Sequence, residues 1–461
     1  MAQQFEEPQF KEQGGAATMD PSSLQRWLTS RLAMHMNSES RFEKRRAKAE
    51  RTRLKAGRRH VVDYFHQIED GYSYLAAQVL QRFAERYDIE LRCHLVRGPE
   101  GKNAPDAALL LKLSRYDASW IASEYGLNFP VDGESPSSDN INLAGAISAS
   151  VRSEERLAVL PKVGEALWRN DAQALEGLAE LHGRATDFEV EASLNMGTEL
   201  RAKLKHYSGA MFYYEGEWYW GIDRLHYLEE RLVSLGASRS PNESFVAPCP
   251  DVSVEGVSDA SGLTLEFFPS LRSPYTSIVF DETVALAQRI GINFVMRPVL
   301  PMVMRGVPAT REKGLYIFSD TAREARRRGV PYGNFHDPIG NPVRRCYAIY
   351  PWAVSLGRGT ELLSSFLKHA FSMGVNTNND RGLKRVVEAA GLDWREAQAH
   401  LGDTEWEKML EDNRLSMYEG GLWGVPSYRL IDADGNTHLE IWGQDRLWLV
   451  AREIRRLHQG M

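Results

Sequence analysis

Leu265-Glu266-Phe267-Phe268, followed closely by Ser273-Pro274-Tyr275-Thr276, sets the architecture of this chain. The first four residues are typical of a buried strand. Ser-Pro is typical of a helix start, because serine caps free N–H groups and proline fits the first turn. A similar stretch occurs earlier, as Val62-Asp63-Tyr64-Phe65 followed by Asp70-Gly71-Tyr72-Ser73. The pattern therefore predicts that a strand leading into a helix occurs twice.

The two copies stay in one register over more than sixty residues. A constant offset of 203 residues relates them, and it places Gly126 on Gly329. A second pair of landmarks follows, Trp220-Gly221-Ile222-Asp223-Arg224-Leu225 and Trp442-Gly443-Gln444-Asp445-Arg446-Leu447, at an offset of 222. About 19 residues of insertion then lie between the landmarks, in the middle or in the final hairpin. We interpret the chain as two divergent copies of one domain of roughly 200 residues.

Each copy follows the same predicted plan, which makes the fold class α/β. A strand, a helix and a second strand form a βαβ unit, and a helical insertion, an antiparallel hairpin and a closing helix follow. In the first copy we expect strands at 61–65 and 89–96, helices at 71–87, 106–125 and 153–181, a hairpin at 211–220 and a helix at 223–235. In the second copy we expect strands at 263–268 and 292–299, a helix at 274–290, a helical insertion at 310–415, a hairpin at 428–442 and a helix at 445–457.

Composition suggests where the domains begin and end. Residues 1–19 lack apolar periodicity and predict a disordered tail. Residues 20–59 predict a helical arm that is strongly basic from Arg41 to Arg59. The basic run could bind an acidic partner or nucleic acid. We favour a solvated arm packed on the body, because no aromatic residues interleave the charges. The first repeat is placed at 60–236, a linker rich in Ser, Pro and Gly at 237–262, and the second repeat at 263–461.

The overall balance of residues excludes several classes of protein. With 461 residues, 43% hydrophobic and 26% charged, and a formal net charge of −6, the chain has the composition of a globular protein and not that of a nucleic-acid binder. Its three cysteines are far apart, and its twelve histidines show no metal-ligand spacing, so we expect no disulfide framework and no metal site. No apolar run is long enough to span a bilayer, and a cytoplasmic location follows as the default.

Two places in the second repeat could carry chemistry. Ser273, at a helix start, could stabilise a thiolate or another anion, although it could equally serve only as a helix cap. Pro426, in Gly424-Val425-Pro426 before a strand, could be an ordinary edge feature. If it were cis and faced the helix start, the backbone of Val425 would be free to pair with a peptide-like ligand.

Taken together, these motifs are more specific than either is separately. Strand-Ser-Pro-Tyr-helix, Gly-Val-Pro before a hairpin, and the closing Trp-Gly-Gln-Asp-Arg-Leu resemble the 2-hydroxychromene-2-carboxylate isomerase family. These proteins are grouped with kappa-class glutathione transferases in the DsbA-like branch of the thioredoxin fold. The resemblance covers nearly all of the second repeat and mainly the ends of the first. It implies two tandem thioredoxin-like domains, each with a helical insertion.

The resemblance also implies a glutathione site, residue by residue. Ser273 would match the catalytic serine that holds the glutathione sulfur as a thiolate. Val425, before Pro426, would match the residue whose backbone pairs with the glutathione cysteine. The γ-glutamyl end would be received by Gln444, Asp445 and Arg446, and the glycine carboxylate would lie near Lys313. Carboxylates facing an ammonium and cations facing carboxylates are sound pairings.

The first repeat departs from this pattern. Asp70 replaces the serine and Gly71 its proline, and Met211 is set against Pro426. An aspartate would repel a thiolate, so we expect a noncatalytic copy. We expect the second repeat to catalyse a glutathione-assisted isomerisation or transfer on an aromatic or conjugated small molecule.

The alternatives are a thiol-disulfide oxidoreductase, which the cysteines disfavour, and a noncatalytic binding or scaffold protein. Because members of the family form homodimers, the two repeats are expected to dock as a pseudo-dimer within the chain, with homo-oligomers as a further alternative.

Overall fold

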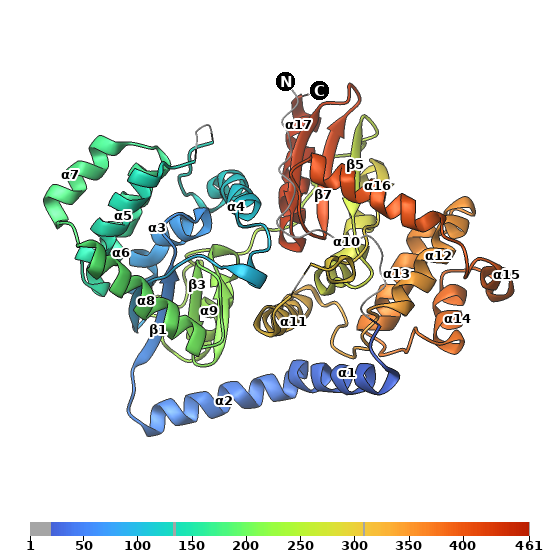
Figure 1. Ribbon diagram of the computed structural model, residues 1–461, viewed down its shortest axis with the longest axis horizontal. Helices are drawn as coiled ribbons and strands as arrows, with labels where there is room; N and C mark the ends of the chain where they lie inside the picture. The colour runs from blue at the N-terminus through green and yellow to red at the C-terminus, as the bar shows by residue number, and fades with distance from the viewer. Residues whose placement is uncertain (1–19, 132–134, 308, 461) are drawn as a thin grey trace. The chain divides into compact units, whose positions relative to one another are not determined.

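The computed structural model describes residues 20–131, 135–307 and 309–460. The chain forms two compact units, which we call the first domain (residues 44–250) and the second domain (residues 251–461 with the chain up to residue 43). Figure 1 shows their helices and strands along the chain. The tail predicted at 1–19 lies outside the described residues.

The first domain is built on a four-stranded mixed sheet with the order β2-β1-β3-β4. The strands are β1 (His60–His66), β2 (Ile89–Leu95), β3 (Met211–Tyr214) and β4 (Glu217–Trp220). β1 and β2 are parallel, and β3 is antiparallel to both β1 and β4. The helices are α3 (Gly71–Arg86), η1 (Gly101–Asn103), α4 (Ala107–Ile121), η2 (Ala122–Tyr125), α5 (Ser138–Ser150), α6 (Ser153–Trp168), α7 (Ala172–His182), α8 (Asp187–Lys203), η3 (Ile222–Arg224) and α9 (Leu225–Ser234).

The second domain repeats this sheet with the order β6-β5-β7-β8 and the same strand directions. Its strands are β5 (Leu263–Phe268), β6 (Asn293–Met296), β7 (Ser427–Asp432) and β8 (Thr437–Trp442). Its helices are α10 (Pro274–Ile290), η4 (Met302–Arg305), α11 (Arg311–Arg328), α12 (Asn341–Ser355), α13 (Gly359–Phe371), α14 (Asp380–Ala389), α15 (Trp394–Ala399), α16 (Glu405–Glu419), η5 (Gln444–Arg446) and α17 (Leu447–Gly460). The α/β fold class with two sheets and helical insertions is confirmed.

Strand register corrects one equivalence between the domains. The sequence comparison sets Met211 against Pro426, and this assignment is wrong by one residue. In the first domain Phe65 of β1 faces Met211. In the second domain the equivalent residue, Phe268, faces Ser427 and not Pro426. The comparison aligned two Gly-x-x triplets on their glycines, whereas the pairing of each strand with its neighbour fixes the position.

Backbone hydrogen bonds agree with the corrected register. The Gly221 N–H donates to the Ala210 carbonyl (2.7 Å), and the Gly443 N–H donates to the Pro426 carbonyl (3.0 Å). Ala210 therefore takes the place of Pro426. The offset between the domains is 203 residues at β1 and β5 and 216 at β3 and β7. Of the 19 extra residues, most lie in the helical insertion and the rest in the hairpin.

The N-terminal arm consists of α1 (Ser23–Asn37) and α2 (Glu39–Lys55). α1 belongs to the second domain, where the buried Arg26 guanidinium donates to the carbonyls of Asp337 and Ile339 (2.6 Å each). The Ser30 hydroxyl accepts from the Asp337 N–H (3.0 Å). The polar face of α1 is therefore the packed one, and its large apolar side chains are exposed, at Leu24, Trp27, Leu28 and Leu32.

The segment after α9 is fastened to the first domain by one buried carboxylate. Glu229, which is 0% exposed, accepts hydrogen bonds from the Tyr87 hydroxyl (2.9 Å) and from the N–H groups of Val246 (2.7 Å) and Ala247 (3.1 Å). The Arg82 guanidinium donates to the Val246 carbonyl (2.7 Å). The sequence analysis places Val246 and Ala247 in the linker at 237–262, whereas in the structure they are bonded to side chains of α3 and α9. None of the helices described is long and apolar enough to cross a membrane.

Candidate functional site

Ser273 lies where β5 gives way to α10, and it caps that helix. The Thr276 N–H donates to the Ser273 Oγ (3.2 Å), and Pro274 occupies the first turn. The Ser273 hydroxyl also donates to the Val425 carbonyl at 3.4 Å. The Val425–Pro426 peptide bond is cis. Two stretches separated by about 150 residues, the helix start and the loop before β7, therefore meet at this hydroxyl.

Packing holds the loop between β5 and α10 in place. The Leu271 N–H donates to the hydroxyl of the buried Tyr347 on α12 (3.2 Å), and that hydroxyl donates to the Val299 carbonyl (3.3 Å). The Ser270 N–H donates to the Thr276 Oγ1 (3.4 Å). Because these groups are buried, water does not replace their hydrogen bonds, and the loop between β5 and α10 holds Ser273 in one position. We call this junction the Ser273 corner.

Val425 presents its backbone at this corner. Its side chain packs against a core cluster that includes Phe268, Val299 and Leu422. Within the described ranges its N–H has no hydrogen-bond acceptor, and its residue surface is half-buried. A half-exposed N–H and a carbonyl held only by a long bond to Ser273 can pair with an extended backbone.

Lys313 lies in the first turn of α11, and its side chain is half-buried. Burial lowers the pKa of its ammonium, and no carboxylate of the described residues forms an ion pair with it. α11 packs on α10, where the Tyr275 hydroxyl donates to the Asp320 carboxylate (2.9 Å). Lys313 precedes Asp320 by two helical turns, about 10 Å along the axis. Lys313 is therefore a partly buried cation, without an ion pair to a carboxylate of the described residues, on the helix that packs against α10.

The side chains of Gln444 and Arg446, in the closing hexapeptide, bond to other groups of the protein. The buried Gln444 amide donates to Glu324 of α11 (3.1 Å), and Arg328 donates to the Gln444 carbonyl (3.2 Å). Arg446 is 3% exposed and donates to the Asp445 carbonyl (3.2 Å). Asp445 is half-buried, and its carboxylate lies 3.7 Å from the Arg446 guanidinium.

Asp70 occupies the equivalent place in the first domain and is enclosed. Its carboxylate accepts from the Ser73 N–H (2.9 Å), the Ser73 hydroxyl (2.8 Å) and the Ser114 hydroxyl (2.6 Å). Burial raises the pKa of this carboxyl. A Cβ at Gly71 would lie 3.1 Å from the Ser114 carbonyl, so α4 closes over the corner. This corner is filled by the protein's own groups.

The cysteines lie away from the Ser273 corner in sequence and in environment. Cys93 and Cys346 are buried, Cys249 is half-buried, and none of the three forms a disulfide. Burial raises the pKa of the Cys93 thiol to about 12. Among the described residues, no group of three or more His, Cys, Asp or Glu side chains could hold a metal ion.

Residues 264–455 match the family described as the DSBA-like thioredoxin domain. This part of the chain is a DsbA-like thioredoxin domain. No curated protein sequence is similar enough to count as a match. Solved structures similar in fold include a 2-hydroxychromene-2-carboxylate isomerase (17% identity, TM-score 0.37, covering 43% of this chain and 97% of that one). The cytosolic disulfide reductase DsbM from Pseudomonas aeruginosa is also similar (17%, 0.33, 43% and 97%), and another structure of it is described with GSH (15%, 0.32, 43% and 98%).

The sequence comparison missed residues that hold the corner of the DsbA-like domain. Tyr347 is more than seventy positions from Leu271, so no local pattern links them. Arg272 bonds to Asp337 (3.3 Å), and it could have been noticed only as the neighbour of Ser273. An aromatic residue within an apolar helix carries no signal of such a role.

Proposed function

We propose that the DsbA-like domain binds glutathione at the start of α10 and uses it to isomerise, or to conjugate, an aromatic or conjugated small molecule. The observation that carries this proposal is the meeting of Ser273 with the Val425 backbone. A hydroxyl at a helix start lies beside a backbone N–H that has no acceptor among the described residues. This arrangement fits a cysteinyl ligand, because the sulfur and the backbone of one residue are bound together.

The roles of the residues follow from their positions. The Ser273 hydroxyl would turn from the Val425 carbonyl, a bond that is already long at 3.4 Å, and donate to the sulfur. The dipole of α10 adds to this stabilisation, so the thiol pKa falls. Val425 would hold the cysteinyl backbone. Lys313 would bind the glycine carboxylate, which supplies its missing counterion. Asp445 would receive the γ-glutamyl ammonium, with Gln444 and Arg446 positioning it.

When bound, glutathione would supply a nucleophilic thiolate, held by Ser273 and the Val425 backbone, for reversible addition to an electrophilic carbon. Ser273 contributes by keeping the sulfur unprotonated both before addition and after departure. Because the backbone of the Ser273 corner is held by Tyr347, only the Ser273 hydroxyl has to rotate.

Two alternatives from the sequence remain distinguishable. A thiol-disulfide oxidoreductase needs a reactive cysteine at the helix start, where this chain has Ser273. A noncatalytic binding protein would take up the ligand but show no turnover. We also propose that the two domains arose by duplication and that the first, with Asp70 enclosed, is noncatalytic. A cytoplasmic location is part of the proposal, because glutathione stays reduced there.

Calorimetric titration of the full chain with reduced glutathione tests the site. We expect binding to weaken by about tenfold in Ser273→Ala and in Lys313→Met, since each loses one charge-assisted hydrogen bond. Ser277→Ala is the matched control, because that hydroxyl donates only to the Pro274 carbonyl. No binding to the wild type contradicts the proposal. Undiminished binding in both variants would place glutathione elsewhere.

Turnover is tested separately, with conjugated aromatic substrates followed by absorbance. Reduced glutathione should support the reaction, and S-methylglutathione, which keeps the peptide but lacks the thiol, should inhibit it. Equal rates with and without glutathione would refute the enzymatic part of the proposal. A positive dithiol exchange assay would favour the oxidoreductase alternative.

A further inference from the structure

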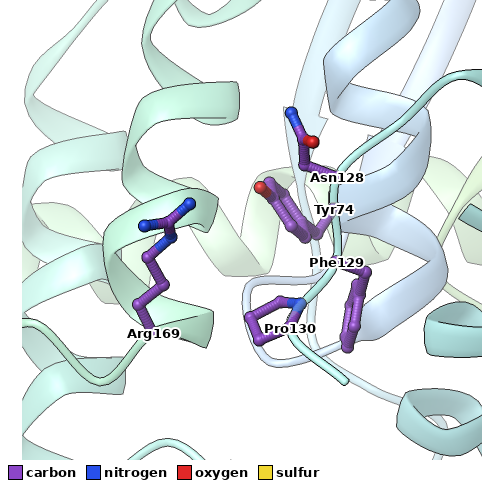
Figure 2. A pocket seen from close by; sticks show the side chains of 5 residues that line it. All are labelled: Tyr74, Asn128, Phe129, Pro130 and Arg169. Atoms are coloured by element: carbon purple, nitrogen blue, oxygen red, sulfur yellow. The ribbon is translucent and has the colours of Figure 1, made fainter. Parts of the chain in front are cut away.

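A pocket of about 310 Å³ lies in the first domain, and Asp70 is not among the residues that line it. Figure 2 shows the five residues that line it: Tyr74, Asn128, Phe129, Pro130 and Arg169. Tyr74 belongs to α3, Arg169 directly follows α6, and the other three lie in the loop after η2. A pocket of this volume is at the small end of those that hold organic ligands, and it suits a single ring.

The apolar wall of the pocket is held by close packing. The Tyr74 ring lies against Gly164 of α6, where an added Cβ would come within 2.3 Å of the ring. Phe129 contacts Tyr74 (5.8 Å between ring centres) and Trp168 (4.9 Å). Glycine at 164 therefore seats the tyrosine, and Trp168 supports the phenylalanine from behind. The rings are preorganised.

The loop that carries Phe129 is fastened to α3. The Gln78 amide nitrogen donates to the Asn128 carbonyl (2.8 Å), and the Asn128 N–H donates to the Gln78 amide oxygen (3.0 Å). This pair of bonds fixes the loop one helical turn beyond Tyr74. The distance between the two sides of the pocket is thus set by the fold.

Two of the polar side chains that line the pocket, Tyr74 and Arg169, can donate hydrogen bonds to a ligand. Tyr74 is 3% exposed, yet its hydroxyl has no hydrogen-bond partner among the described residues. Burial, and then the nearby Glu165 carboxylate, raise the pKa of Tyr74 to about 12, so the phenol stays protonated. Arg169 pairs with Glu165 at 3.2 Å, but both side chains are more than half exposed. Such an ion pair is weak and is easily exchanged for a ligand carboxylate.

We propose that this pocket binds a small aromatic carboxylate. The Arg169 guanidinium and the Tyr74 hydroxyl donate to the carboxylate, and the ring lies against Phe129 and Pro130. Figure 2 shows the phenol oxygen and the guanidinium on the two sides of the space between α3 and α6.

The charge of the lining distinguishes this ligand from others. None of the five lining residues is acidic, and the nearby Glu165 carboxylate is already paired with Arg169, so an organic cation would have to displace Arg169 from it. A neutral ring would offer no acceptor to the Tyr74 hydroxyl that faces the pocket. At the offset of 203 residues Tyr74 corresponds to Ser277, so the DsbA-like domain lacks the phenol. The pocket is therefore a feature of the first domain and is independent of the proposed glutathione site.

Binding of benzoate to the full chain tests the proposal, with benzylamine as a probe of the same size and opposite charge. Titration by ligand-observed NMR should give a dissociation constant in the range of about 0.1–1 mM for benzoate. Arg169→Gln should weaken binding about tenfold and Tyr74→Phe about threefold. Arg152→Gln, at an exposed arginine that pairs with Glu155, is the matched control and should leave binding unchanged.

Three outcomes overturn the proposal. They are the absence of benzoate binding at concentrations up to about 10 times the expected dissociation constant, equal binding of benzoate to the wild type and to Arg169→Gln, and binding of benzylamine as tight as that of benzoate. Tyr74→Phe removes only the hydroxyl, Arg169→Gln shortens an exposed side chain, and an unchanged thermal melt establishes that each variant is folded. Between pH 6 and 9 benzoate affinity should stay constant, because the Tyr74 phenol remains protonated and the ligand ionised. A loss of affinity as pH rises through this range would also count against the assigned donor.

Discussion

Replacing Glu229 with alanine should release the segment that follows α9 from the first domain. The carboxylate is fully buried and accepts from the Tyr87 hydroxyl and from the N–H groups of Val246 and Ala247. Burial raises its pKa, whereas the three hydrogen bonds lower it. In the alanine variant all three donors stay buried without an acceptor.

The cost can be worked out from these bonds. An unsatisfied buried donor costs about 1–3 kcal/mol, and loss of the carboxylate's own desolvation offsets part of the sum, which leaves about 3–5 kcal/mol. Glu229→Gln keeps one acceptor oxygen and opposes its NH₂ group to one N–H, so the expected cost is about 1–2 kcal/mol. Opening of residues 246–247 should become at least about 100-fold more frequent in the alanine variant.

Hydrogen–deuterium exchange read by mass spectrometry measures this opening directly in peptides that contain Val246 and Ala247. The matched control is Glu230→Ala, at the exposed neighbouring position of α9. Exchange that is unchanged in Glu229→Ala, or accelerated equally by Glu230→Ala, would refute the role assigned to the buried carboxylate.

Three further predictions concern stability. Arg26→Ala should lower the unfolding free energy of the second domain by about 2–4 kcal/mol, and with it the melting temperature. The reason is that the carbonyls of Asp337 and Ile339 lose their buried guanidinium donor. The pKa of His66 is lowered to about 3 by burial and then by a nearby arginine, below its usual value of 6.5. The neutral His66 therefore contributes fully to stability above pH 6.5, and this contribution is lost at about 1.4 kcal/mol per pH unit as pH falls below that value. Urea unfolding midpoints measured from pH 7.5 to 5 should fall less steeply in His66→Gln than in the wild type. Gly424→Ala should cost about 1–3 kcal/mol and alter tryptophan fluorescence, because its Cβ would lie 2.2 Å from the Trp442 ring, whereas Gly402→Ala, with open space around it, should do neither.

Local patterns in the sequence predicted the parts of the fold that depend on local interactions. The capping of α10 by Ser273 and its end at Gly291, with φ of 63°, follow from residue types that act within one turn. The aromatic hairpin β3–β4 follows from alternating residues around a turn. Long-range pairing could not be predicted in the same way. Whether Ala210 or Met211 takes the place of Pro426 depends on which residue faces Phe65 across the sheet.

The candidate site shows the same limit. The sequence names Ser273, Val425 and Lys313, and the structure brings Ser273 against Val425. The sequence gives no sign of Tyr347, which lies about seventy residues further along the chain and fixes the loop before Ser273. The helices α5 and α8 were also missed, because small and polar residues such as those in Ser138–Ser150 weaken the apolar period.

The hydrogen bond between Arg26 and Asp337 means that α1 is synthesised well before it can dock. The residues it joins are 311 positions apart, so α1 leaves the ribosome long before its binding site exists. At typical rates of synthesis the delay is about 15–60 s. Throughout that time the first domain, whose strands lie between His60 and Trp220, can complete its own sheet. Helix α1, which is made first, therefore docks only after the first domain has had time to fold.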